Sequence, residues 1–128
     1  MLSADDILAI HALLARYGHR LDAADWTGLA ELWAEDGTLD FRLLGVEQTY
    51  TGREAIAGFY SSAHHPLAHH CTNIDVVERD GEVHVHSKWL VPRRDGTVGG
   101  GDYRDVVART TDGWRFKLRI GTPRPGDR

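Results

Sequence analysis

The 128-residue chain lacks the marks of several large protein classes. It has one cysteine, Cys71, which excludes an internal disulfide framework and fits a reducing compartment. No apolar run approaches the roughly 18 residues that a membrane-spanning helix requires. The acidic start, MLSADDILAIHALL, also lacks the cationic leader of a secretory signal. We therefore expect a soluble, cytoplasmic protein without a membrane partner.

Excess positive charge and metal motifs are missing as well. Fifteen Lys and Arg residues against 19 Asp and Glu residues give a formal charge of −4, which argues against a nucleic-acid partner. Neither H-E-x-x-H nor C-x-x-C occurs, and Gly99-Gly100-Gly101 is not followed by the Gly-Lys-Ser/Thr of a phosphate loop. Adjacent histidines such as His69 and His70 point to opposite faces of a strand, so they do not easily chelate one ion. We expect no metal and no cofactor.

What is present is enough for a compact core. Hydrophobic residues make up 41% of the chain and charged residues 27%, and the length predicts one domain. Ser3 and Asp6 predict a capping box. A long helix is then indicated by one apolar stripe, made of Ile7, Ile10, Leu14, Tyr17 and Leu21. A short helix is predicted over Trp26–Trp33, and a capping box of Thr51 and Glu54 predicts a third.

The second half is rich in strand patterns. Short strands are predicted at 38–41 and 45–51, and longer ones at 69–78, 82–91, 103–110 and 114–120. Asp80-Gly81 and Asp112-Gly113 predict two hairpin turns. Gly99-Gly100-Gly101 suggests a flexible joint, and the proline-containing end predicts a flexible tail over 122–128.

Helices followed by a meander of strands predict an α+β domain over residues 1–121, with the helices on one face of a curved antiparallel sheet. Such a sheet encloses a pocket suited to a small apolar ligand.

Four side chains are candidates for chemistry: Tyr17, Asp22, His69 and Arg119. Histidine is the commonest general base near neutral pH, and a carboxylate on its second nitrogen fixes the tautomer. Spacing alone favours a solvent-facing position at a helix end for Asp22 and a place in a solvated basic stripe for Arg119.

Several segments together resemble a known family. They are 15–26 (ARYGHRLDAADW), 32–33 (LW), 36–40 (DGTLD), 52–56 (GREAI), 69–73 (HHCTN), 101–105 (GDYRD) and 112–116 (DGWRF). Over residues 7–120 the chain resembles SnoaL-like proteins of the nuclear transport factor 2-like superfamily, which implies a cone-shaped α+β roll. The superfamily hosts dehydratases, isomerases, cyclases and binding-only members, so the resemblance is specific for fold and not for function.

The resemblance also implies site residues. Scytalone dehydratase, bile-acid 7α-dehydratases and hexachlorocyclohexane dehydrochlorinase share a His–Asp pair, which corresponds to His69 and Asp22. Tyr17 matches a tyrosine of the bile-acid enzymes, and Arg119 resembles an arginine near the leaving group. The substrate-binding set is expected to be Phe41, Trp26, Tyr103, Asp105 and Leu90.

Two departures from the family patterns stand out. Scytalone dehydratase has a second histidine where this chain has Arg93. The base aspartate of ketosteroid isomerases corresponds to Phe41, which weakens an isomerase assignment.

Strand alternation conflicts with this site. It places His69 on the polar face of its hairpin and His70 on the apolar face, and Arg119 opposes Trp114 and Phe116 in the same way. A β-bulge would reverse the alternation. Alternatively, the outer apolar face is covered by a second subunit, and this second solution is preferred because one cause explains both conflicts. It predicts a homodimer or larger oligomer.

The favoured function is a cofactor-independent lyase acting by dehydration on a small cyclic, polyketide- or steroid-like substrate. An isomerase or polyketide cyclase using the same pair is the first alternative. A non-catalytic ligand-binding domain is the second, and it predicts that Asp22 and His69 do not meet.

Overall fold

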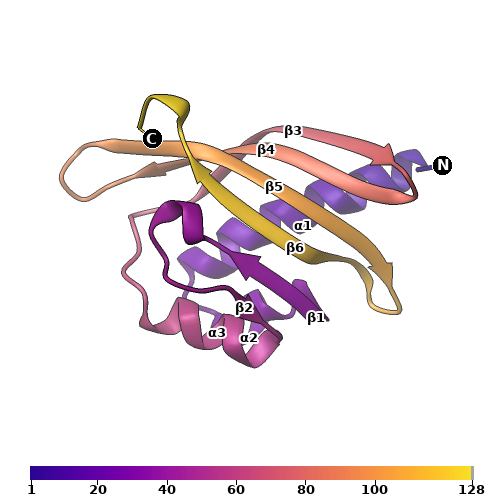
Figure 1. Ribbon diagram of the computed structural model, residues 1–128, viewed down its shortest axis with the longest axis horizontal. Coiled ribbons are helices and arrows are strands. Elements are labelled where there is room, and N and C mark those ends of the chain that lie inside the picture. Colours follow the sequence, from indigo (N-terminus) through magenta and orange to yellow (C-terminus); the bar gives the residue numbers. More distant parts are fainter. Residues whose placement is uncertain (128) are drawn as a thin grey trace.

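A computed structural model describes residues 1–127 of the chain (Figure 1). Its helices are α1 (Ala4–Asp22), α2 (Trp26–Ala30) and α3 (Arg53–Ser62), with 3-10 turns η1 (Arg42–Leu44) and η2 (Pro125–Asp127). Its strands are β1 (Trp33–Asp40), β2 (Tyr50–Thr51), β3 (His70–Arg79), β4 (Glu82–Pro92), β5 (Val98–Thr110) and β6 (Gly113–Pro123). None of the helices in this described part is long and apolar enough to span a membrane.

The helix starts follow local capping. The hydroxyl of Ser3 accepts from the amide of Asp6 at 3.0 Å, and the Ser3 amide donates to the Asp6 carboxylate at 2.9 Å, which confirms the capping box of α1. The predicted capping box of α3 is wrong, because Gly52 is the N-cap. The hydroxyl of Thr51 instead lies 2.9 Å from that of Thr38 and joins β2 to β1.

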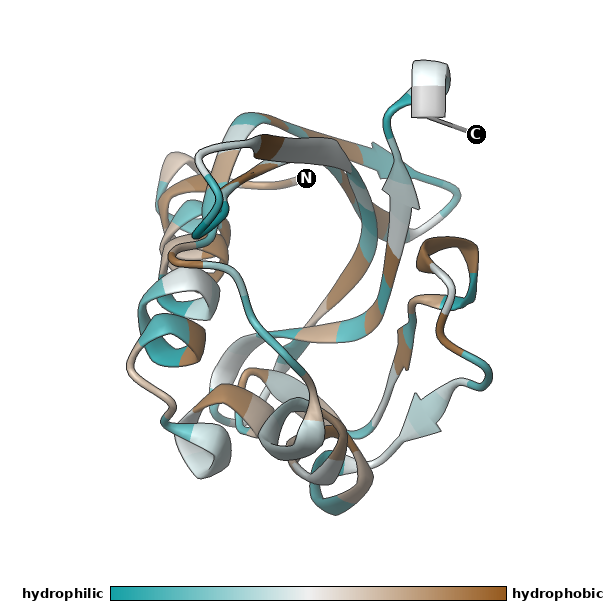
Figure 2. Cartoon of the chain, turned by 90° about the vertical axis from the view of Figure 1, so that its left-hand side faces the viewer, coloured by the Kyte–Doolittle hydropathy of each residue, from teal (hydrophilic) through white to brown (hydrophobic). Residues whose placement is uncertain are grey.

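The six strands form one curved sheet in the order β2-β1-β6-β5-β4-β3. All neighbouring pairs are antiparallel except β1 and β6, which run parallel. The fold is therefore the expected α+β roll, and the sheet does not close into a barrel. Seen end-on, the sheet curls around one side of the molecule and the helices lie on the other (Figure 2).

The hairpin turns confirm the Asp-Gly predictions. Asp80 and Gly81 have φ values of 54° and 79° and connect the paired residues Arg79 and Glu82. This is the left-handed conformation that tight hairpins need. The second hairpin is present with its turn one residue earlier, at Thr111 and Asp112, because Thr110 pairs with Gly113, which begins β6 with a φ of 103°.

Three element predictions are corrected. Trp33 begins β1 and does not end α2, because its side chain is fully buried against the sheet. Residues 99–101 are not a joint; they lie within β5 and pair with β4. The tail boundary at residue 121 falls inside β6, where Thr122 pairs with Asp102. Beyond it η2 stands away from the sheet (Figure 2), and Arg128 lies outside the described residues.

Two β-bulges explain the alternation conflict. Between Thr72 and Asp75 the register of β3 against β4 shifts, with Asn73 at φ 53°. This brings His69 to the same side of the sheet as Ile74. In β6, Lys117 is an extra residue, because Phe116 and Leu118 pair with consecutive residues of β5.

The solution preferred from the sequence, a second subunit covering the outer face, is therefore not what turns His69 and Arg119 inward. The bulges do so within one chain. The homodimer stays a prediction.

Candidate functional site

A pocket of about 890 Å³ opens between the inner face of the sheet, α3 and the segments beside η1. Six Phe, Tyr and Trp side chains line it, namely Tyr17, Phe41, Phe59, Tyr60, Trp89 and Tyr103. Three histidines also line it, namely His64, His65 and His69, and Arg93, Arg94 and Asp95 lie where β4 meets β5. This size and apolar lining suit a ring-shaped organic molecule.

His69 and Asp22 meet at the wall of this pocket. Nδ1 of His69 lies 2.7 Å from Oδ1 of Asp22, and the backbone amide of His69 donates to Oδ2 at 3.0 Å. The side chain of His69 is 13% exposed and that of Asp22 is 32% exposed. Because a carboxylate only accepts, Nδ1 carries the proton and Nε2 is left with a lone pair. One oxygen of Asp22 thus orients the imidazole of His69, and the other holds the backbone of the same residue.

A glycine makes this contact possible. A Cβ at Gly18 would lie 2.7 Å from the carbonyl oxygen of His69, closer than real side chains come. The missing side chain therefore lets α1 approach the start of β3. Asp22 is one turn further along α1, at its last residue, so the carboxylate reaches His69.

Burial sets the protonation of His69. Desolvation lowers the pKa of His69 below its usual value, and the Asp22 carboxylate opposes this shift only in part. The neighbouring imidazoles of His65 and His70 lower the pKa further by repulsion. His69 is consequently neutral at pH 7, which is the form that accepts a proton.

Tyr17 supplies a hydroxyl in the same pocket. Its oxygen lies 2.7 Å from that of Tyr60, and both side chains are almost completely buried. Burial raises the pKa of Tyr17, while the charge of Arg119 opposes the rise. Tyr17 therefore remains a protonated donor, one that an adjacent cation polarises.

Arg119 does not line the pocket. It is fully buried and its guanidinium donates to both oxygens of Asp105 at 2.8 and 2.9 Å. Its central carbon lies 4.2 Å from the ring centre of Tyr17 and 3.8 Å from that of Tyr103. The predicted direct role of Arg119 at the leaving group is corrected, because aromatic rings cover it. Two of these rings, those of Tyr17 and Tyr103, line the pocket and separate Arg119 from it.

Three of the predicted substrate-binding residues also lie elsewhere. Asp105 is fully buried as the partner of Arg119. Leu90 is 47% exposed and pairs with His70, on the outer face of the sheet. Trp26 is not part of the pocket wall; its ring lies 5.3 Å from that of His65, behind the wall. Phe41 and Tyr103 do line the pocket and stack with ring centres 6.3 Å apart.

Sequence reasoning missed Tyr60 and Trp89, and it counted His65 among four candidate histidines without placing it in the site. Tyr60 follows the apolar pattern of α3 and Trp89 that of β4, so both are indistinguishable from core residues in the sequence. His65 lies in the connection after α3, where its Nε2 donates to the carbonyl of Tyr60 at 2.7 Å. Within residues 1–127 no group of three His, Cys, Asp or Glu side chains is arranged to hold a metal ion.

Comparison with known proteins agrees with this architecture. A family model described as SnoaL-like domain matches residues 3–120. An NTF2-like protein with a cystatin-like fold from Novosphingobium aromaticivorans is 30% identical, with a TM-score of 0.83 over 95% of this chain and 84% of that one. No curated protein matches the sequence significantly.

Two further structures come from the same organism. A provisionally assigned aromatic ring hydroxylase is 25% identical, with a TM-score of 0.77 over 96% of this chain and 92% of that one. A provisionally assigned scytalone dehydratase is 24% identical, with a TM-score of 0.77 over 95% and 89% of the two chains. The last of these shows similarity of fold alone.

Proposed function

The chain belongs to the SnoaL-like domain family, and from this premise we propose that it is a cofactor-independent lyase that removes water from a small cyclic substrate. The proposal depends chiefly on the 2.7 Å contact between His69 and Asp22 at the wall of an aromatic pocket. A non-catalytic binding domain predicts that the two side chains do not meet, so their contact supports the catalytic alternatives.

His69 is the proposed base. Its Nε2 takes a proton from a carbon next to a carbonyl group, and the electron pair of the broken C–H bond moves into an enolate. Tyr17 donates a hydrogen bond to the enolate oxygen. As the enolate collapses, the C–O bond at the β-carbon breaks, and hydroxide leaves with the proton that His69 had taken. Water and an unsaturated ketone result.

Each group contributes a recognisable factor. A positioned base accelerates such a step by about 10²–10⁴, and a fixed donor at a developing oxyanion by about 10²–10³. Asp22 stabilises the imidazolium that forms on His69. Arg119 is a positioning residue, which holds Tyr17 and Tyr103 through its contacts with their rings.

An isomerase or cyclase that enolises a ketone is the second candidate. One observation favours it: Arg119 is covered by aromatic rings and so cannot assist a departing hydroxide. Enolisation requires only the base and the hydroxyl donor, and both line the pocket.

The test is incubation of the protein with a panel of cyclic β-hydroxy ketones, followed by mass spectrometry and enone absorbance. We expect loss of one water from at least one compound, and no loss with His69→Ala or Asp22→Ala at unchanged circular dichroism. His11→Ala is the matched control, because this histidine of α1 is exposed and does not line the pocket. Turnover retained in His69→Ala would contradict the mechanism, and a product of unchanged mass would favour the second candidate.

A further inference from the structure

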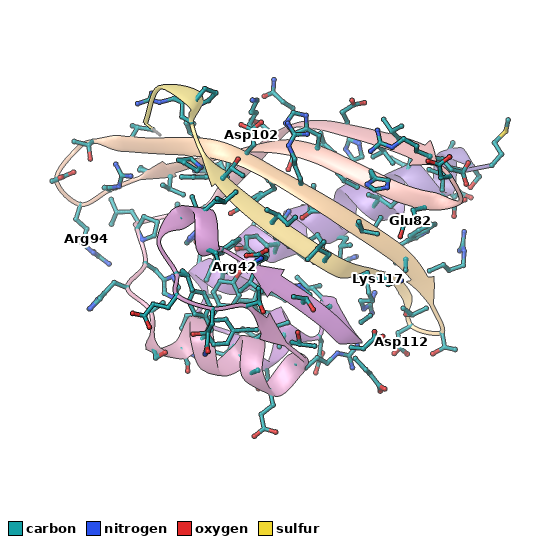
Figure 3. The ribbon with its side chains drawn as sticks, in the orientation of Figure 1. Arg42, Glu82, Arg94, Asp102, Asp112 and Lys117 are labelled. Atoms are coloured by element: carbon teal, nitrogen blue, oxygen red, sulfur yellow. The ribbon has the colours of Figure 1, made fainter. Side chains whose placement is uncertain are left out.

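The loop from β4 to β5 places two cations at one end of the pocket. Arg93 and Arg94 both belong to the pocket lining, although the protein carries a net charge of −4. Figure 3 shows Arg94 at the end of the sheet, projecting toward the side where α3 lies. Two positive charges thus lie in one part of the pocket lining.

These arginines form no ion pair with the carboxylates that the structure describes. Among residues 1–126, neither guanidinium has an Asp or Glu oxygen within 4.0 Å. Asp95, the acidic residue in the lining, accepts from the amide and the hydroxyl of Thr97 at 2.9 and 2.6 Å. Nη1 of Arg93 donates to the same hydroxyl at 3.4 Å, so Thr97 lies between the two charges and Nη2 of Arg93 stays available for a ligand. The other carboxylate close to the pocket, Asp22, is used by His69.

Arg93 is also aimed at the pocket. A Cβ at Gly99 would collide with Nη2 of Arg93 and would lie 3.0 Å from a methyl group of Val91. Because Val91 is a buried residue of the pocket wall, the guanidinium lies on the inner side of the sheet. The loop is held in shape by the Arg93 amide, which donates to the carbonyl of Thr97 at 2.9 Å.

We propose that the pocket takes a ring-shaped substrate bearing an oxyanion, a carboxylate or a phosphate, with the ring against the aromatic wall and the oxyanion on Arg93. The planar guanidinium offers paired N–H donors that match either group, and Arg94 adds a second positive charge. This inference rests on the proposed function, since it names the substrate class of the same pocket.

The experiment measures binding of three unreactive probes by isothermal titration calorimetry. They are 1-naphthylacetate, 1-naphthyl phosphate and the neutral 1-naphthylacetamide. We expect at least one anionic probe to bind about tenfold more tightly than the amide, as suits a charge-assisted contact near solvent. The preference weakens as salt is added, and the tighter anion identifies the oxyanion class.

Arg93→Gln is expected to reduce the preference to about twofold or less, and Arg94→Gln to reduce it by a smaller factor. Arg104→Gln is the matched control, because Arg104 is exposed and alternates with inward-facing Tyr103 and Asp105 on β5. Equal affinity for all three probes, undetectable binding of both anions, or an unchanged preference in Arg93→Gln would overturn the proposal.

This outcome is independent of the proton chemistry. His69→Ala should keep the preference for the anionic probe, because burial keeps His69 neutral and its Nδ1 is engaged with Asp22, so the imidazole adds no charge to the anion site. Loss of anion preference with turnover intact would reject this inference alone. Intact preference without turnover would reject the proposed lyase alone.

Discussion

Replacing Asp22 by Asn tests how the carboxylate controls His69. Two donors of His69, its Nδ1–H and its backbone N–H, each use one oxygen of Asp22. An amide has only one oxygen, so one donor must then face an NH₂ group. If the amide nitrogen faces the ring, Nδ1 becomes the acceptor and the proton moves to Nε2. The base nitrogen is then blocked.

The expected loss of rate is about 10²–10⁴, the whole contribution of a positioned base. The expected loss of stability is small, about 1 kcal/mol, because one hydrogen bond is removed at a side chain that is 32% exposed. A large effect on rate with a small one on folding separates this role from a merely structural one.

Two measurements check this prediction. Nitrogen-15 NMR of the imidazoles reports which ring nitrogen of His69 carries the proton, and urea unfolding reports stability. Asp36→Asn is the control, since it makes the same chemical change at an exposed position. If Asp22→Asn keeps the Nδ1–H tautomer and wild-type turnover, the Asp22 carboxylate does not control the protonation of His69.

Three further outcomes follow from the same contacts. Burial lowers the pKa of His69 in the folded protein, so the contribution of His69 to folding stability is complete above the unfolded pKa, near 6.5, and is lost as the pH falls through the lower folded pKa. Turnover requires neutral His69, so a pH–rate profile should show a decline only below about pH 6.5. Asp105→Asn leaves the charge of Arg119 buried without its full partner and should cost about 3–5 kcal/mol in urea unfolding; a loss below 1 kcal/mol would contradict a charged pair. Gly18→Ala should displace His69 and lower turnover at least tenfold. Gly58→Ala in α3, where a Cβ meets nothing within 4 Å, is the control and should raise stability by up to about 1 kcal/mol. Equal effects of the two variants on turnover and on stability would count against the close approach of α1 to β3.

Local signals in the sequence identified much of the fold. The capping box at Ser3 and the two Asp-Gly turns depend on neighbouring residues only, and all three are present. Local pattern places Trp33 at the end of a helix. Its true position in β1 depends on its contact with Phe116, more than 80 residues away in the chain, which a local pattern does not contain.

The bulges could not be read from alternation, because a bulge is a departure from it. Asn73 carried the only local hint, since Asn tolerates a positive φ better than most residues. No comparable signal marks Lys117. Without these shifts, a period-two pattern assigns both His69 and Arg119 to the wrong face.

The site was only partly accessible to sequence reasoning. The resemblance to the family pointed to Asp22 and His69, although their contact depends on the space left at Gly18. The complete burial of Arg119 could not be predicted from the sequence, because it depends on the rings of Tyr17 and Tyr103 and on the charge of Asp105. The prediction that Leu90 binds substrate is wrong because the sequence does not show which residues pair with it, and this pairing determines the face of the sheet on which Leu90 lies.

The most direct test of proton removal by His69 is hydrogen–deuterium exchange at the α-carbon of a cyclic aromatic ketone such as 1-tetralone, followed by proton NMR in D₂O. If His69 removes the proton, exchange is well above the buffer rate with the wild-type protein and at the buffer rate with His69→Ala. Equal exchange with both proteins would contradict it.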